Sequence, residues 1–352
     1  MKRFNKPIIV AIALLLFAVS ACDFGDGKSR KDRSSGGTCE ILVVTQNEDQ
    51  WTGMMGDTLR AFFMQPQYGL PQPEALYRLT HVNVSGFSEM FKKHKCLLIA
   101  EINPELDHPV VEMGEDVWSA PQRVIKIVAP DRTSWCQTFD EQKEAYKILY
   151  DKVERDRVLS LLRPSNNVGI AQKVKEKMGF DMVIPAGYNI KKEEPDFLWI
   201  SKELEKSSLG IFIYTTPYTD TLQLEPNDLI SERDRMMQRY VPGPTTGSFM
   251  TTEKEDMPPM VSYISYFPTG FAAEMRGMWC LVGDYMGGPF VSYTFPDNRT
   301  GNLVTLEGYI YYPNQFKRND LLQVQSILFS ISMPEETAEE APEAAPESAP
   351  VE

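Results

Sequence analysis

The amino-acid sequence predicts an α/β (α+β) protein made of two similar halves, each a mixed sheet packed with helices. Short apolar runs rich in β-branched residues alternate with segments whose apolar residues recur every three or four positions. The same order of elements occurs in both halves, where an apolar strand and a helix come first and a long helix comes last. These observations predict an internal duplication.

The first half, residues 39–163, begins with a continuous apolar run and ends with a long helix. Apolar spacing predicts strands at 41–44, 79–84, 96–102 and 124–128, and helices at 56–64, 86–94 and 140–163. Thr138 and Glu141 have the spacing of a capping box at the start of the long helix, and Pro164 ends it.

The second half, residues 209–333, follows a bridging segment at 164–208. The bridge is predicted to contain a helix at 171–178 and strands at 182–185 and 197–201. The second half is predicted to contain strands at 209–215, 260–267, 278–282, 290–295 and 304–312, and a helix at 228–240. Its last helix follows Pro313 and has aliphatic residues along one face.

Matching spacings in the two halves support the duplication. Cys96 follows Phe87 by nine residues, and Cys280 follows Phe271 by nine residues, each just before an apolar run. A duplication requires the two halves to have the same strand order. The alternative is one continuous α+β sheet in which these matches are accidental.

The N-terminus has the layout of a secretory signal peptide at residues 1–21. A basic head with Lys2, Arg3 and Lys6 precedes an apolar run, and small residues precede Cys22. This arrangement predicts a bacterial lipobox, in which Cys22 is acylated and anchors the mature chain to a membrane. The apolar run is too short to cross a hydrocarbon core of ~30 Å as a helix.

Two polar segments flank the predicted folded part. Residues 22–38 are rich in Asp, Gly, Ser, Lys and Arg and are predicted to be a flexible tether. Residues 334–352 contain seven Glu and no basic residue, and are predicted to be a disordered acidic tail. Without the signal peptide and the tail the chain carries a net charge of about −9, which argues against nucleic acid or an anionic membrane surface as a partner.

Four cysteines follow the predicted anchor: Cys39, Cys96, Cys136 and Cys280. An even number in an oxidising compartment leaves disulfides open. Three of these residues stand at the edges of apolar runs, where a free cysteine packs as a small hydrophobe. The sequence therefore favours buried thiols over bridges.

The sequence contains little that is typical of a catalytic site. Its three histidines are His81 in a predicted strand, His94 at a helix end, where we expect a solvated cation, and His108 in a loop. The spacings of a nucleophile elbow, a zinc-protease helix and a phosphate-binding loop are absent. Acidic residues between 105 and 116 lack the spacing of a calcium loop, so we expect neither a metal nor a cofactor.

Two glycine-containing loops hold the candidate ligand-binding residues. These are Gly243 and Gly247 in one loop, and Asp284, Gly287 and Gly288 in the other. Glycine lets a ligand approach the backbone closely, although both loops also have the composition of ordinary turns.

Aromatic residues are a further candidate for binding. They include Trp51, Trp118, Trp135, Trp199 and Trp279, and the tyrosines between 309 and 312. Such side chains line grooves that bind glycans or peptides, and in alternating strands they equally form the core.

Several short motifs carry a resemblance to a known family. The longest is GFAAEMRGMWCLVGDYMGGP at 270–289, and the others are Val183-Ile184-Pro185, Gly187-Tyr188, Arg233-Asp234, Pro242-Gly243-Pro244, Tyr311-Tyr312-Pro313 and Lys317-Arg318. They resemble an uncharacterised family of Bacteroidota lipoproteins, the domain of unknown function 4837 family, along nearly the whole mature chain. The resemblance implies an envelope lipoprotein and supplies no catalytic residues.

The expected function is that of a lipid-anchored cell-envelope protein, on the periplasmic or surface face, that binds or braces another component. Its expected partners are the membrane, through Cys22, and an envelope protein or glycan. The scarcity of histidine and the absence of a nucleophile–base motif favour this non-catalytic role. The alternative is a hydrolase of an envelope polymer that uses carboxylates such as Glu274 and Asp284.

Overall fold

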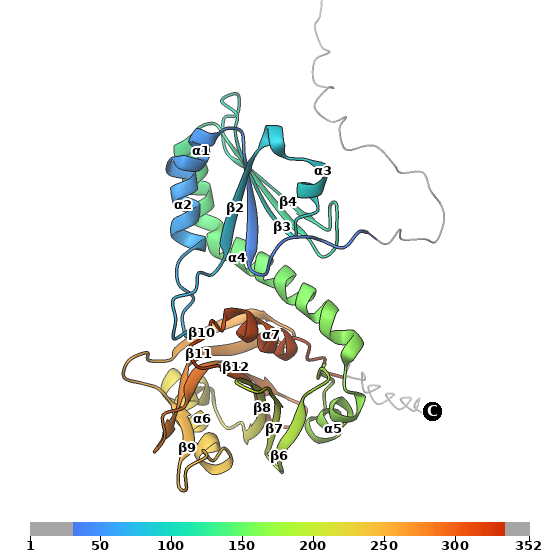
Figure 1. Cartoon of the computed structure of the whole chain (residues 1–352), viewed down its shortest axis with the longest axis vertical. Coiled ribbons are helices and arrows are strands. Elements are labelled where there is room, and N and C mark those ends of the chain that lie inside the picture. Colours follow the sequence, from blue (N-terminus) through green and yellow to red (C-terminus); the bar gives the residue numbers. More distant parts are fainter. Residues whose placement is uncertain (1–30, 335–352) are drawn as a thin grey trace, which may run out of the picture.

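The structure, a computed structural model, describes residues 31–334 and contains two domains joined by one long helix (Figure 1). The two sheets and their covering helices confirm the α+β class. The predicted signal peptide, Cys22 and nearly all of the acidic tail lie outside the described residues. Within them, no helix is both long and apolar enough to cross a membrane.

The first domain is built on a five-stranded sheet with the order β2-β1-β3-β5-β4. The first four strands in that order run parallel, and the edge strand β4 runs antiparallel. Its strands are β1 (Glu40–Thr45), β2 (Arg78–Asn83), β3 (Cys96–Ile102), β4 (Val110–Glu115) and β5 (Arg123–Ala129). The central strands are buried on both faces, as expected for a parallel sheet covered by helices.

Helices cover both faces of this first sheet. One face packs against α2 and α4 around Phe63, Phe139 and Tyr150, and the other packs against Phe87 and Phe91 around the short α3. The elements are α1 (Glu48–Thr52), α2 (Met54–Phe63), η1 (Val84–Gly86), α3 (Glu89–Lys92) and α4 (Arg132–Leu162).

The second domain is built on an antiparallel sheet with the order β10-β11-β12-β13-β8-β7-β6, in which β9 also pairs with β11. Helices α5 and α7 cover one face and α6 covers the other. The strands are β6 (Asn189–Glu194), β7 (Phe197–Glu203), β8 (Ser208–Pro217), β9 (Phe249–Thr252), β10 (Met260–Phe267), β11 (Gly270–Val282), β12 (Gly287–Asp297) and β13 (Asn302–Tyr311). The helices are η2 (Arg163–Ser165), α5 (Val168–Met178), η3 (Thr221–Leu224), α6 (Pro226–Tyr240) and α7 (Arg318–Leu328).

The two domains contact each other through α4 and α7 (Figure 1). Leu322 on α7 packs into the aromatic core of the first domain. Glu74 of the first domain accepts hydrogen bonds from the backbone N–H groups of Lys317 and Arg318, at 2.6 and 3.1 Å, at the start of α7. A carboxylate at this position satisfies amides that a helix leaves unpaired at its N-terminus, so one domain caps a helix of the other.

The predicted internal duplication is wrong. The first sheet is mainly parallel, whereas the second is antiparallel and has a different strand order. The two halves are therefore not similar, and the second is not a mixed sheet. The local spacing of apolar runs does not determine which strands pair. The same short spacings therefore occur in two domains of different topology.

The segment at 164–208, predicted as a bridge, is part of the second domain. Its strands β6 and β7 extend the eight-stranded sheet beyond β8, and α5 packs on that sheet. The predicted strand at 182–185 is absent, and only isolated backbone pairs occur around it.

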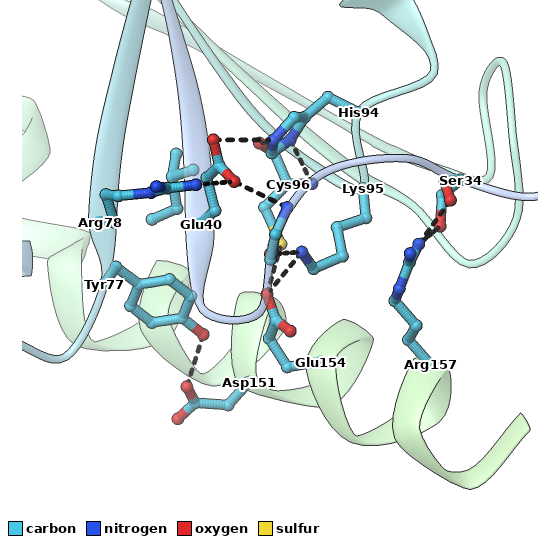
Figure 2. Close-up of polar contacts among 12 residues, drawn as sticks. Ser34, Glu40, Tyr77, Arg78, His94, Lys95, Cys96, Asp151, Glu154 and Arg157 are labelled. Carbon is cyan, nitrogen blue, oxygen red and sulfur yellow. Dashed lines mark hydrogen bonds and ion pairs between the residues drawn. The ribbon is translucent and has the colours of Figure 1, made fainter. Parts of the chain in front are cut away.

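The predicted flexible tether is wrong for its described part, residues 31–38, which we call the strap. The strap lies against the first domain and pairs through its backbone with the segments around His94 and Ala120. Ser34 is 4% exposed. Figure 2 shows the strap and the polar side chains beneath it.

Candidate functional site

A pocket of about 700 Å³ opens on the second domain, beyond the C-terminal end of α6. Its floor comes from one face of the sheet, where β7, β8 and β13 lie side by side and β12 separates β13 from β11. The lining residues are Trp199, Glu203–Ser208, Val241–Pro244, Met250, Trp279, Leu281, Met286, Tyr309, Tyr311–Pro313 and Gln315. This volume lies within the ~300–1,000 Å³ typical of small-molecule sites.

Five aromatic residues line the pocket: Trp199, Trp279, Tyr309, Tyr311 and Tyr312. Trp279 and Tyr309 are buried, whereas Trp199 and Tyr311 are half-buried and form part of its walls. The Trp199 Nε1–H donates to the Tyr309 hydroxyl at 3.0 Å, and the Trp279 Nε1–H donates to the Ile310 carbonyl at 3.1 Å. Both indole N–H groups are therefore used within the protein, and the rings are held before any ligand arrives.

Glycines create the space that these rings occupy. A Cβ on Gly210 would stand 1.9 Å from the Tyr309 ring. A Cβ on Gly288 would stand 2.0 Å from the Ile310 carbonyl oxygen and 3.1 Å from the Trp279 indole nitrogen. Gly288, a sequence-predicted site residue, therefore supports the pocket from below its floor.

The two glycine loops predicted from the sequence meet beside this pocket. The Thr245 hydroxyl donates to the Asp284 carboxylate at 2.6 Å and lowers the pKa of Asp284 below its ordinary value. Gly243 lines the pocket and Gly247 does not. Gly247 has a φ of +83° and open space around it, so its role is that of a turn.

Exposed apolar side chains lie in the segments that border the pocket. Leu204 is 52% exposed and belongs to the lining, and Tyr285 and Phe316, next to the lining residues Met286 and Gln315, are fully and 71% exposed. Exposed apolar groups beside a pocket are typical of interaction sites. Polar groups from the β7–β8 turn, residues 203–208, complete the lining.

The carboxylates of the predicted hydrolase do not form a pair. Glu274 lies in the middle of β11 and Asp284 follows its end, and eight strand residues span roughly 26 Å. Glu274 pairs instead with Arg276 at 2.7 Å and accepts from the Tyr293 hydroxyl at 2.6 Å. Burial raises the pKa of Glu274, but the charge of Arg276 outweighs it and holds this pKa below its ordinary value. This arrangement contradicts the spacing of ~5–10 Å that a glycosidase pair requires.

Glu274 and Arg276 belong to a second cavity, of about 270 Å³, that lies between the domains. Across it, Lys147 on α4 contacts Asp151 at 2.6 Å, and Asp151 accepts from the Tyr77 hydroxyl at 2.7 Å. These charged groups have partners within the protein, so the cavity has the character of a polar domain interface.

The remaining candidate residues lie away from the aromatic pocket. His81 is in β2, as predicted, and bonds the Thr45 hydroxyl at 2.8 Å. His94 is 6% exposed, so the prediction of a solvated cation is wrong. In the described part of the chain, no three His, Cys, Asp or Glu side chains gather closely enough to hold a metal ion.

The four described cysteines are free thiols, and those of Cys39, Cys96 and Cys136 are buried, which confirms the prediction of buried thiols. Cys280 is half-buried. Desolvation raises the pKa of Cys39 to about 12, so this thiol stays protonated and unreactive at neutral pH.

Comparison with known families divides the chain at the same place as the structure does. Residues 34–163 match a domain of unknown function designated DUF8532, and residues 167–330 match the domain of unknown function DUF4837. No curated protein matches the sequence. The human StarD13 (DLC2) lipid transfer and protein localization domain is a matching solved structure, with 11% identity and a TM-score of 0.22 over 47% of this chain and 96% of that chain. That TM-score is too low to indicate a shared fold.

The family predicted from the sequence motifs is thus confirmed, but over the second domain alone rather than nearly the whole mature chain. The first domain matches a different family, which agrees with its different strand order. The aromatic pocket, the glycine loops and the 270–289 motif all lie within residues 167–330. The chain therefore carries its aromatic pocket in a domain that belongs to the DUF4837 family.

Proposed function

We propose that this protein is a lipid-anchored, non-catalytic binding protein of the cell envelope, and that the aromatic pocket binds a glycan segment. The observation that carries the proposal is the set of aromatic rings in the lining, of which Trp199, Trp279 and Tyr309 are held in place by hydrogen bonds. The apolar C–H face of a sugar ring packs on such a surface, while its hydroxyl groups reach polar atoms at the rim.

The rim supplies polar groups of the required kind. Glu203, Ser208 and Gln315 line the pocket beside the half-buried rings. Glu203 accepts from the Ser201 hydroxyl at 2.8 Å and lies 3.5 Å from the Lys191 ammonium, so its carboxylate is held in place. A mixed lining of this kind suits a neutral polyhydroxylated ligand better than a purely apolar one.

The lipid anchor is supported by the sequence around Cys22. Replacing Cys22 with Ser removes the acceptor sulfur, so we expect loss of the acyl mass and release of the protein from membranes. Mass spectrometry and fractionation after a carbonate wash measure both effects. Full retention of the Cys22→Ser protein on membranes would contradict the anchor.

The binding role is tested by calorimetric titration of the purified full-length protein with oligosaccharides released from bacterial envelope polysaccharides. Trp199→Ala and Tyr311→Ala should each weaken binding by about tenfold or more, because truncating an aromatic anchor costs ~2 kcal/mol. Tyr263→Ala removes an exposed aromatic from β10, outside the pocket lining, and is the matched control.

Three outcomes would overturn the glycan proposal. In the first, no oligosaccharide binds while an apolar peptide does. In the second, the Trp199→Ala and Tyr311→Ala proteins bind the oligosaccharide as well as the wild type does. In the third, reducing ends appear during the titration, which would identify a hydrolase instead.

A further inference from the structure

The strap is attached to the first domain along its backbone. The Ser35 N–H donates to the Lys93 carbonyl at 2.8 Å, and the Lys95 N–H donates back to the Ser35 carbonyl at 3.1 Å. On the other side of the strap, Ser34 and Ala120 belong to a second backbone pairing. These bonds on both sides fix a segment that sequence composition assigns to a linker.

Charged side chains beneath the strap hold it more firmly (Figure 2). Lys95 is fully buried, forms an ion pair with Glu154 of α4 at 3.2 Å and donates to the Gly37 carbonyl. Arg157 of α4 donates to the carbonyl and to the hydroxyl of Ser34. Removing the strap would leave the Lys95–Glu154 pair with one fewer partner, which is costly for a buried charge.

The strap sequence fits this position because it contains two glycines. Gly36 has a φ of +100°, and a Cβ there would stand 2.4 Å from Nε2 of His94. A Cβ on Gly37 would stand 2.5 Å from the Glu40 carboxylate. Side chains at these two positions would force the strap away from the domain, so docking is specific to this sequence.

Docking shortens the chain between the proposed anchor and the domain. Only residues 23–30 separate Cys22 from the strap, and a chain of this length reaches at most ~30 Å. A free segment of residues 23–38 would reach ~55 Å. This step rests on the proposed lipid anchor, and the docked strap then limits how far the first domain can move from the membrane.

Basic side chains also lie on the strap side of the first domain, in a chain whose net charge is −13. Lys31 and Arg33 are exposed on the strap, and Lys93 follows α3 beside it. Lys93 pairs with Asp32 at 2.5 Å, and Lys92 pairs with Glu89 at 2.6 Å. The positive charges left over by these pairs are those of Lys31, which donates to the Asp116 carbonyl, and Arg33. A basic side chain close to an anionic lipid surface is attracted to it, and this attraction weakens as salt is added.

We propose that the strap fixes the orientation of the protein on the membrane, with the strap side of the first domain facing anionic lipid headgroups. The docked backbone, the short remaining chain and the local positive charge support the same orientation. The aromatic pocket is on the other domain and is left free for its ligand.

The test uses energy transfer from a fluorophore on the full-length lipidated protein to labelled headgroups in anionic vesicles. Fluorophores are attached through Met90→Cys on α3, beside the strap, or through Leu222→Cys on the second domain, both exposed positions, in a Cys280→Ser background. The other described cysteines, Cys39, Cys96 and Cys136, are buried. We expect transfer from position 90 to be several-fold higher than from position 222. Equal transfer from both positions would overturn the proposal.

Two variants separate the contributions of docking and charge. Gly36→Val should release the strap and abolish the difference between the two positions, with the circular dichroism of the domain as the check on folding. Lys31→Glu/Arg33→Glu keeps the glycines and should lower the transfer from position 90, most strongly at low salt. An unchanged difference in both variants would overturn the proposal. Absence of an acyl group on wild-type Cys22 would instead show that the anchor itself is wrong.

Discussion

At the scale of single residues, His94 shows how the strap changes the chemistry of a side chain. Burial lowers the pKa of His94 to about 4, with a further contribution from the neighbouring Lys95 charge, and the Glu40 carboxylate opposes the change without cancelling it. His94 is therefore neutral in the folded protein at pH 7. Its local sequence suggested a solvated cation because the Gly36 backbone that covers its ring comes from 58 residues earlier in the chain.

This low pKa predicts that acid destabilises the first domain. The unfolded histidine has a pKa of ~6.5, so the unfolded state binds more protons between pH 6.5 and 4 and the free energy of unfolding falls as pH falls. The loss reaches at most roughly 3 kcal/mol. Urea unfolding at pH 7 and pH 4.5 should show a smaller pH dependence in His94→Gln than in the wild type. Equal pH dependence in the two proteins would contradict this account.

At the scale of elements, α4 begins earlier than its sequence predicts. The Asp131 side chain accepts from the N–H groups of Thr133 and Ser134, at 2.8 and 2.9 Å, and caps the helix at Arg132. Thr138 and Glu141 match a capping box but lie in the second turn or beyond, where the Thr138 hydroxyl bonds the Ser134 carbonyl. Two overlapping cap signals occur in this sequence, and the first is the one used.

The cap assignment gives a prediction with a matched control. Asp131→Ala should lower the free energy of unfolding by ~1 kcal/mol, because it leaves the first-turn N–H groups of α4 without their acceptor. Thr138→Ala should cost almost nothing, because alanine favours a helix interior. Urea unfolding of both variants measures this difference, and a larger loss in Thr138→Ala would restore the capping box as the true start.

Strand prediction succeeded where apolar residues mark a strand and failed for edge strands rich in charged residues. The predicted bounds of β3 and β10 are those of the structure, because apolar residues mark both strands. β4 and β6 were missed, since VVEMGE and NIKKEE carry charges that protect a sheet edge and hide the strand pattern. The candidate site could be predicted only in part. The glycine loops and the two tryptophans of the pocket were candidates from the sequence, but strand pairing determines that they lie close together in the structure.

At the scale of the whole molecule, the two domains share an interface built by α4 and α7. Leu322 of α7 belongs to the core of the first domain, and Arg155 of α4 lies 3.9 Å from the centre of the Phe329 ring of the second domain. These contacts join two sheets of different topology, whose apolar spacing alone suggested two copies of one unit. The order in which strands pair is a long-range property, and the spacing of short runs does not contain it.

The interface predicts that the wild type unfolds in a single calorimetric transition. Leu322→Ala should separate this transition into two, because it removes the side chain that links the second domain to the core of the first. Leu321→Ala is the matched control on the same helix, since Leu321 packs in the core of its own domain. It should lower the melting temperature and keep one transition. Two transitions in the wild type would contradict a shared cooperative unit.

The hydrogen-bonded rings of the aromatic pocket have a consequence for the entropy of binding. Ordering a mobile side chain on association costs ~0.5–1.5 kcal/mol, so ordering three of them costs roughly 1.5–4.5 kcal/mol. Trp199, Trp279 and Tyr309 are already held by their hydrogen bonds in the free protein. These side chains are therefore already ordered when a ligand arrives. Little further entropy is lost on binding, so most of the free energy of the contacts with the rings contributes to affinity.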